Sequence, residues 1–296
     1  MKKLYLLFLF FVSEILFSQN YYHQFLELMK ENDTVNTKKI LLEWEKVNNN
    51  DPEFYVAAVN FYFNQSQEEV LSLTTEHPKS ESLALKDETG KTAGYIGSSV
   101  YYKSKYLKKT FWYFDEAIKK FPNRLDIRFG KIYSLEKIGD YENFTKEIIS
   151  AIEYSKVINN QWLWSENKKY DDGKKGFLGS IQDYINQLFN TNNDALLKNM
   201  RVISEEVLKH YPNEIEFVTN IGTTYLIENN MDKALEYLLS AEKINNKDYI
   251  VLNNIGRAYE IKGDTSNAIK YYELTEKYGD EYAKEEAKKE LKKLNK

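Results

Sequence analysis

The residue types that most often perform chemistry form no recognisable catalytic motif in this sequence. Cysteine is absent, which excludes disulfides, thiolate zinc sites and cysteine nucleophiles. The three histidines, His23, His77 and His210, lie far apart along the chain, so no local metal or acid–base motif can be assigned to them. The patterns HExxH, GxSxG and GxGxxG are also absent. We therefore expect a non-enzymatic protein that needs neither a metal nor a cofactor.

Polar side chains at recurring positions are better candidates for binding a polypeptide. Asn220 and Asn254 recur at the interval of a sequence repeat described below, and a helical period turns the residue three positions after each of them to the same side. An asparagine can bond both the N–H and the C=O of an extended backbone, and Arg257 could hold a carboxylate. Asparagine is abundant in this chain, so the spacing could also reflect composition alone. The predicted partner-binding residues of this type are Asn60, Asn220, Thr223, Asn254 and Arg257.

Two tryptophans lie in a polar stretch at residues 159–176, which has the sequence NNQWLWSENKKYDDGKKG. Tryptophan buries a large area wherever it can, so Trp162 and Trp164 either pack beneath this loop or form an aromatic platform for a ligand. We keep both as candidate partner-binding residues. Asp171 and Asp172 lack the alternating oxygen spacing of a calcium loop and predict only a turn.

The composition favours an ordinary globular protein. Hydrophobic residues make up 42% of the 296 residues and charged residues 29%, which argues against disorder and against several membrane spans. The 41 basic and 45 acidic residues give a net charge of −4, with no basic excess to neutralise phosphates. We therefore expect no nucleic-acid partner.

The segment 1–18 resembles a secretory signal. Lys2 and Lys3 precede a run of apolar residues at 4–12, and Ser18 is a small residue at a plausible cleavage point. The apolar run is too short to span about 30 Å of hydrocarbon. A buried N-terminal helix or an uncleaved anchor remains the alternative, since Glu14 interrupts the region. The prediction is export to the periplasm or cell envelope, with no transmembrane span after cleavage and peripheral envelope association possible.

The strongest pattern in the chain is an internal repeat near its C-terminus. Gly222 and Gly256 are 34 apart in sequence, as are Tyr225 and Tyr259. Ala234 and Ala268 keep the same interval. Two helix pairs are predicted, at 215–228 with 232–244 and at 249–262 with 265–277. The glycines let the second helix of each pair approach the first closely, and the tyrosines fill the space beside these small residues.

These residues resemble the tetratricopeptide repeat (TPR), whose pattern places glycine, tyrosine and alanine at the matching positions. The chain departs from that pattern at Thr275, where alanine is usual, and at Asn246 and Asp280, where proline is usual. The resemblance implies an all-α, α–α superhelical solenoid whose concave groove binds a peptide or protein partner. It is specific over the last two repeat units, and we expect C-terminal TPR-like repeats over 177–282.

The rest of the chain is predicted to contain degenerate helical repeats. Pro52, Pro122 and Pro212 each follow an amphipathic helix, as a helix-stopping proline does. Their spacing leaves room for two insertions. The N-terminal repeats span 19–158 and contain a small β-hairpin insertion at about 66–98, turning at Gly90, with a third strand possible at 70–74. Residues 159–176 form the second insertion, and residues 283–296 a helix that caps the repeat stack.

We therefore expect an exported, non-enzymatic scaffold that binds a peptide or protein partner. The alternative is a helical-repeat protein of the cell envelope that binds glycan or lipid through its aromatic insertions.

Overall fold

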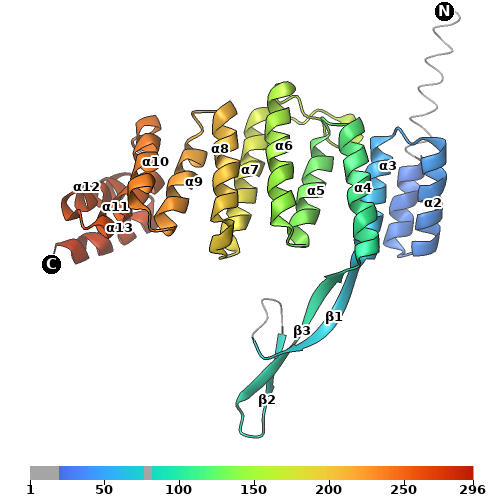
Figure 1. Ribbon diagram of the computed structural model, residues 1–296, viewed down its shortest axis with the longest axis horizontal. Coiled ribbons are helices and arrows are strands. Elements are labelled where there is room, and N and C mark those ends of the chain that lie inside the picture. The colour runs from blue at the N-terminus through green and yellow to red at the C-terminus, as the bar shows by residue number, and fades with distance from the viewer. Residues whose placement is uncertain (1–19, 77–81, 296) are drawn as a thin grey trace, which may run out of the picture. The chain divides into compact units, whose positions relative to one another are not determined.

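The computed structural model describes residues 20–76 and 82–295, which form helices and one small sheet (Figure 1). They divide into two compact units that we describe separately. The N-terminal unit contains the residues up to Gly139 together with Trp162–Tyr170, and the C-terminal unit contains Asp140–Gln161 and the residues from Asp171 onward. The predicted signal segment lies outside the described residues. Among the described helices, none combines the length and apolar character needed to cross a membrane.

The N-terminal unit is built around one largely apolar helix. Because this helix, α3 (Pro52–Ser66), carries hydrophobic residues on all sides, it is buried on nearly every face. Asp51 caps its first turn by accepting a hydrogen bond from the Glu53 backbone N–H, and it also accepts one from the buried Trp44 indole Nε1 at 3.0 Å. The unit contains helical residues 20–30, α2 (Thr34–Val47), α3 (Pro52–Ser66), α4 (Ser104–Lys120) and α5 (Leu125–Lys137).

A three-stranded antiparallel sheet connects the C-terminal end of α3 to the N-terminal end of α4 (Figure 1). The strands are β1 (Gln67–Thr74), β2 (Ser82–Lys86) and β3 (Thr92–Tyr102), in the order β1-β3-β2. The predicted hairpin is confirmed, with Gly90 at φ +83° in its turn, and the possible third strand is present as β1. The helix α4 begins only at Ser104, because Tyr101 and Tyr102 still pair with β1.

A buried arginine holds the Trp-containing loop to the N-terminal unit. Arg124 is fully buried and forms ion pairs of 2.8 Å with both Glu53 and Asp126, and its Nη1 donates to Asn167 of the loop. The Leu125 backbone N–H donates to the Leu163 carbonyl, which fixes the loop beside Arg124. Burial lowers the pKa of Arg124, but the hydrogen bonds and charges of Asp126 and Glu53 more than compensate and raise it above its usual value.

The C-terminal unit consists of helix pairs in register with the predicted period. Its second helices α8, α10 and α12 begin at residues 197, 231 and 265, each 34 after the last. A third pair, α7 with α8, therefore precedes the two found in the sequence. The elements are α6 (Tyr141–Val157), α7 (Gly173–Asn190), α8 (Leu197–His210), α9 (Ile215–Ile227), α10 (Met231–Ile244), α11 (Tyr249–Lys262), α12 (Thr265–Tyr278) and α13 (Glu281–Leu294), with short 3₁₀ turns at Ser165–Asn167 (η1, in the N-terminal unit) and Asp194–Leu196 (η2).

The close approach within each pair depends on the repeated glycines. A Cβ at Gly222 would lie 2.7 Å from Leu238 Cγ, and a Cβ at Gly256 would lie 3.1 Å from the Tyr272 ring. Leu238 and Tyr272 occupy the same position of successive repeats. Beside these contacts Tyr225 stacks on Tyr237 and Tyr259 stacks on Tyr271, with ring centroids 5.9 and 5.8 Å apart. The prediction that small residues permit the close helix crossing is confirmed at both positions.

The last helix, α13, packs a narrow apolar stripe on the final repeat. Ala287 is fully buried against Ala268 and Tyr272, and Leu291 and Leu294 pack at the margin of this cluster. Four of its lysines, Lys284, Lys288, Lys289 and Lys293, form i,i+3 ion pairs with the preceding glutamates. All-α repeats with a small β insertion in the N-terminal half are thus the architecture of this chain.

We expect Arg124→Met to destabilise the N-terminal unit by about 3–5 kcal/mol, because Glu53 and Asp126 would remain buried without their counter-charge. Tryptophan fluorescence during urea unfolding measures this, since all four tryptophans lie in that unit. Arg201→Met is the matched control: Arg201 binds Glu228 through two nitrogens at 2.7 and 2.8 Å but is partly exposed, so the cost, followed by far-UV circular dichroism, should be about 1 kcal/mol. Equal costs would show that the burial of Arg124 adds nothing to the strength of its ion pairs.

We expect Gly222→Ala to destabilise the C-terminal unit by about 1–3 kcal/mol, because the new methyl group would force the buried Leu238 out of place. Gly179→Ala is the control. It lies inside α7 with no atom within 4 Å of the position that a Cβ would take, so helix propensity alone should stabilise the unit by about 1 kcal/mol. Far-UV circular dichroism during urea unfolding reports both changes. Stabilisation by both substitutions would show that the glycine does not control the crossing.

Candidate functional site

A groove lined by the first helices of successive pairs is the candidate site in the C-terminal unit. Three cavities lie along it, of about 560, 400 and 840 Å³. The first and second share Gln182 and Glu216 in their linings, and the second and third share Ile250. The shared side chains make the cavities neighbours along one groove, formed by α7, α9, α11 and finally α13. We refer to them as the first, central and terminal cavities.

The central cavity brings together three of the predicted site residues. Asn220 and Thr223 come from α9 and Asn254 from α11, and all three line it. The Asn254 Nδ2 donates to the Thr223 Oγ1 at 3.3 Å, which orients the Asn254 amide. Asn220 exchanges hydrogen bonds with Gln182 of α7, donating at 2.8 Å and accepting at 3.4 Å.

A third asparagine, Asn186, lies in the same cavity and was missed from the sequence. It lies on α7, exposed, and accepts a hydrogen bond from Gln182 at 3.1 Å. Subtracting 34 from Asn220 gives Asn186, which lies within the repeats expected over 177–282, so extending the asparagine spacing by one more repeat would have identified it. The three asparagines define what we call the asparagine ladder: Asn186, Asn220 and Asn254.

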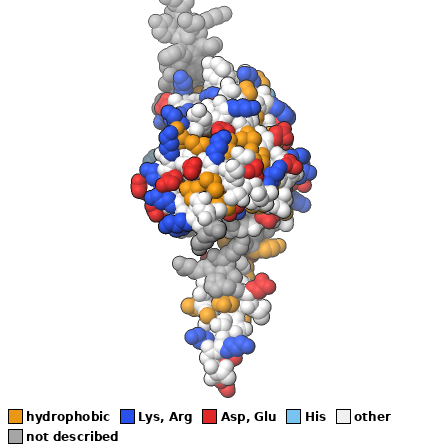
Figure 2. All heavy atoms as spheres, turned by 90° about the vertical axis from the view of Figure 1, so that its left-hand side faces the viewer, with side chains coloured by type: hydrophobic (Ala, Val, Ile, Leu, Met, Phe, Trp, Pro, Cys, Tyr) orange, Lys and Arg blue, Asp and Glu red, His pale blue; other side chains and the backbone are white. Residues whose placement is uncertain are grey.

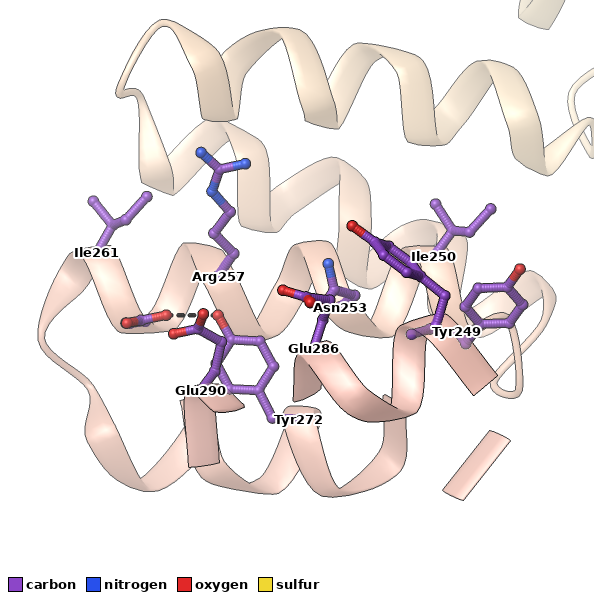
Figure 3. Close-up of a pocket in the computed structure, with 11 residues that line it drawn as sticks. Tyr249, Ile250, Asn253, Arg257, Ile261, Tyr272, Glu286 and Glu290 are labelled. Carbon is purple, nitrogen blue, oxygen red and sulfur yellow. Dashed lines mark hydrogen bonds between the residues drawn. The ribbon is translucent and has the colours of Figure 1, made fainter. Parts of the chain in front are cut away.

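Arg257 lies in the terminal cavity rather than beside the asparagine ladder (Figure 3). It shares this cavity with Glu286 and Glu290 from α13, which form ion pairs with Lys289 and Lys293. Within the described part of the chain the Arg257 guanidinium has no ion-pair partner. It is therefore available to a carboxylate of a bound molecule.

Tyr272 forms the floor of the terminal cavity and is fixed by a carboxylate. Its hydroxyl donates to Glu260 Oε2 at 2.6 Å (Figure 3). Burial raises the pKa of Tyr272 far above its usual value, and the hydrogen bond to Glu260 raises it further. This tyrosine therefore stays neutral and acts as a rigid wall, and not as an acid or base.

The remaining predicted residues lie in the N-terminal unit. Trp162 is completely buried, so it cannot contact a partner, and its packing beneath the loop overturns the platform interpretation for this residue. Trp164 is 38% exposed and lies against Tyr170 and Phe129, with centroid distances of 5.5 and 6.2 Å. Asn60 is exposed on α3 and is not among the residues that line the groove.

The central and terminal cavities offer hydrogen-bonding amides, carboxylates and one cation. Over residues 20–76 and 82–295, no group of three or more histidine, aspartate or glutamate side chains is placed to hold a metal ion. Carboxylates outnumber cations in these two cavities, where Arg257 is the cation. The carboxylates are Glu216, Asp248, Glu260, Glu286 and Glu290.

Comparison with known proteins identifies the repeat. A family model for the tetratricopeptide repeat matches residues 215–248 and 249–274. No curated protein sequence matches the chain significantly.

Three solved structures are among those to which the chain is similar. One, described as a functional characterization of pilF from Pseudomonas aeruginosa, is 11% identical, covers 89% of this chain and 77% of its own, and has a TM-score of 0.30. PilW, described as a widely conserved type IV pilus biogenesis factor, is 10% identical with coverages of 94% and 98% and a TM-score of 0.36. A tetratricopeptide repeat protein from Parabacteroides merdae is 10% identical with coverages of 94% and 92% and a TM-score of 0.35. Scores this low do not bear on function.

Proposed function

We propose that this tetratricopeptide-repeat protein is an exported, non-enzymatic scaffold that holds an extended peptide segment of a partner protein in the groove of its C-terminal unit. The asparagine ladder carries the proposal. Asn186, Asn220 and Asn254 lie at one position of three successive first helices and line one cavity. Recurrent amides on neighbouring helices suit a ligand that itself repeats, and an extended peptide presents a backbone N–H and C=O at every residue.

The dimensions agree with an extended backbone. Neighbouring packed helices lie about 8–10 Å apart, and an extended chain rises about 3.3 Å per residue. Each step of the ladder therefore corresponds to about three peptide residues, and a segment of about seven residues would span all three asparagines. Amide contacts to the backbone N–H and C=O leave the side-chain sequence of the peptide largely unrestricted.

The charges lining the groove define the kind of peptide. The three cavities together are lined by seven carboxylates and by three cations, Lys174, Lys175 and Arg257. Two of the carboxylates, Glu286 and Glu290, also pair with lysines of α13, which leaves a smaller excess of negative charge. A peptide with a net positive charge would be attracted to this surface, while one carboxylate could bind Arg257. We therefore propose a basic or neutral segment that carries a single acidic group at the α13 end of the groove.

The alternative of a glycan- or lipid-binding protein has less support. It requires aromatic side chains that a ligand can reach, and Trp162 is buried while Trp164 is partly covered by Tyr170 and Phe129. A protein partner in the groove is the better-supported proposal.

The groove is tested with peptides selected from a random dodecamer phage library and measured by fluorescence anisotropy. Replacing Asn186, Asn220 and Asn254 together by alanine should weaken binding by at least about tenfold, because each lost backbone contact contributes about 1 kcal/mol. Thermal stability should change little. Asn213→Ala with Asn246→Ala is the control, since both are exposed and neither lines the groove. Unchanged affinity in the triple variant would exclude the groove as the peptide site.

Export is tested by determining the mature N-terminus of the protein from fractionated cells. The two lysines and the apolar run at 4–12 predict cleavage near Ser18 and recovery from the periplasm or envelope fraction. Recovery of the chain with Met1 intact in the cytoplasmic fraction would contradict export. The result is independent of the groove, so the two parts of the proposal can fail separately.

A further inference from the structure

One face of the small sheet is aliphatic and uncovered. Residues paired across antiparallel strands point to the same side, and side chains alternate along each strand. Ile96 pairs with both Leu73 and Leu83, so these three side chains form one row across the sheet. The same side carries further residues at every second position. We call this set the aliphatic face: Leu71, Leu73, Leu83, Leu85, Ile96 and Val100.

The aliphatic face is open to solvent over the described residues. Leu71, Leu73 and Leu83 are 77%, 72% and 73% exposed, and Val100 is 51% exposed. Hydrophobic side chains are visible on the sheet in the lower part of Figure 2, with charged side chains toward its tip. The opposite face also carries the exposed Val70 and Tyr101, but its other residues include Ser72, Thr74, Ser82 and Ser99, so it is less aliphatic. The two faces of one sheet therefore differ in character, as they do where one face is normally covered.

We propose that the aliphatic face is a dimerisation surface, on which the same face of a second copy of this chain packs. The exposed side chains amount to roughly 600 Å² per copy, the upper end of what a monomer usually leaves uncovered. Two such faces together would bury on the order of 1,200 Å², which reaches the lower end of specific, stable interfaces. Stacking two sheets face to face at about 10 Å would give a small β-sandwich.

The charge pattern argues against an anionic membrane as the partner of this face. Glu69 is the charged residue at the α3 end of the aliphatic face, and its carboxylate accepts a hydrogen bond from Ser98. The centre of the face has no charge that would repel its own copy. The segment 67–102 contains six acidic residues against three lysines, so an anionic lipid surface would repel it. The acidic residues are Glu68, Glu69, Glu76, Glu81, Asp87 and Glu88, and the basic residues are Lys79, Lys86 and Lys91.

Sedimentation velocity of the purified full chain tests this proposal. The wild type should form a dimer with a Kd in about the micromolar range. Leu71→Lys with Leu83→Lys should remain monomeric with an unchanged far-UV circular dichroism spectrum. The matched control is Val70→Lys with Ala84→Lys. It also introduces one lysine on β1 and one on β2, but on the opposite face of the sheet. This control should dimerise as the wild type does. Added salt should strengthen the dimer, because it screens the net negative rim and favours apolar burial.

Cross-linking gives a second measurement that does not depend on the lysine variants folding. The chain has no cysteine, so Leu83→Cys introduces a single reactive group. A bis-maleimide that spans about 10 Å should link two copies through Leu83→Cys and not through Ala84→Cys on the other face. A wild type that stays monomeric, or equal cross-linking of both variants, would overturn the proposal. Flotation of a monomeric wild type with phosphatidylcholine vesicles would overturn it in favour of a lipid surface.

Discussion

The close crossing of the two helices in the last two pairs, α9 with α10 and α11 with α12, is the constraint on which the groove depends. At Gly222 the Leu238 side chain occupies the space that a Cβ would need, and at Gly256 the Tyr272 ring does the same. With the pairs locked at this distance, the first helices α7, α9 and α11 present the same positions to one side at every repeat. The asparagine ladder is a consequence of that register, since a shifted pair would turn its asparagine away from the groove.

The N-terminal unit is held together in a different way. Its centre is an apolar helix, α3, and a buried ion-paired arginine that connects α3, α5 and the Trp-containing loop. Buried charges of this kind are costly unless every partner is present, so they specify one arrangement of the loop. The same network explains why the tryptophans of the loop do not form a platform. Hydrogen bonds hold the loop against the unit, and Trp162 packs beneath the loop.

The two proposed interaction surfaces would bind their partners through different kinds of interaction. The groove presents amides and carboxylates, so its contacts are directional hydrogen bonds and charge attraction that salt weakens. The aliphatic face presents mainly leucine, isoleucine and valine side chains, so its contacts depend on the buried area and strengthen with salt. A scaffold with both could bind its peptide and its own copy independently. The sheet joins the helices at its root, where the Lys103 N–H donates to the Ser66 carbonyl.

The sequence by itself determined the repeat. Glycine, tyrosine and alanine recur at a fixed interval, and small residues at these positions allow the two helices of each pair to cross closely. It also determined the β insertion, whose turn at Gly90 requires a positive φ. The repeats expected over 177–282 include the α7–α8 pair, but only the tertiary structure placed Asn186 in the groove, since α7 has no glycine at the crossing position and keeps the register through α8 alone. Whether Trp162, Trp164 and the sheet leucines are covered was also decided by tertiary packing. The exposure of a side chain depends on which distant segments of the chain pack over it. The residues next to it in sequence do not indicate which segments these are.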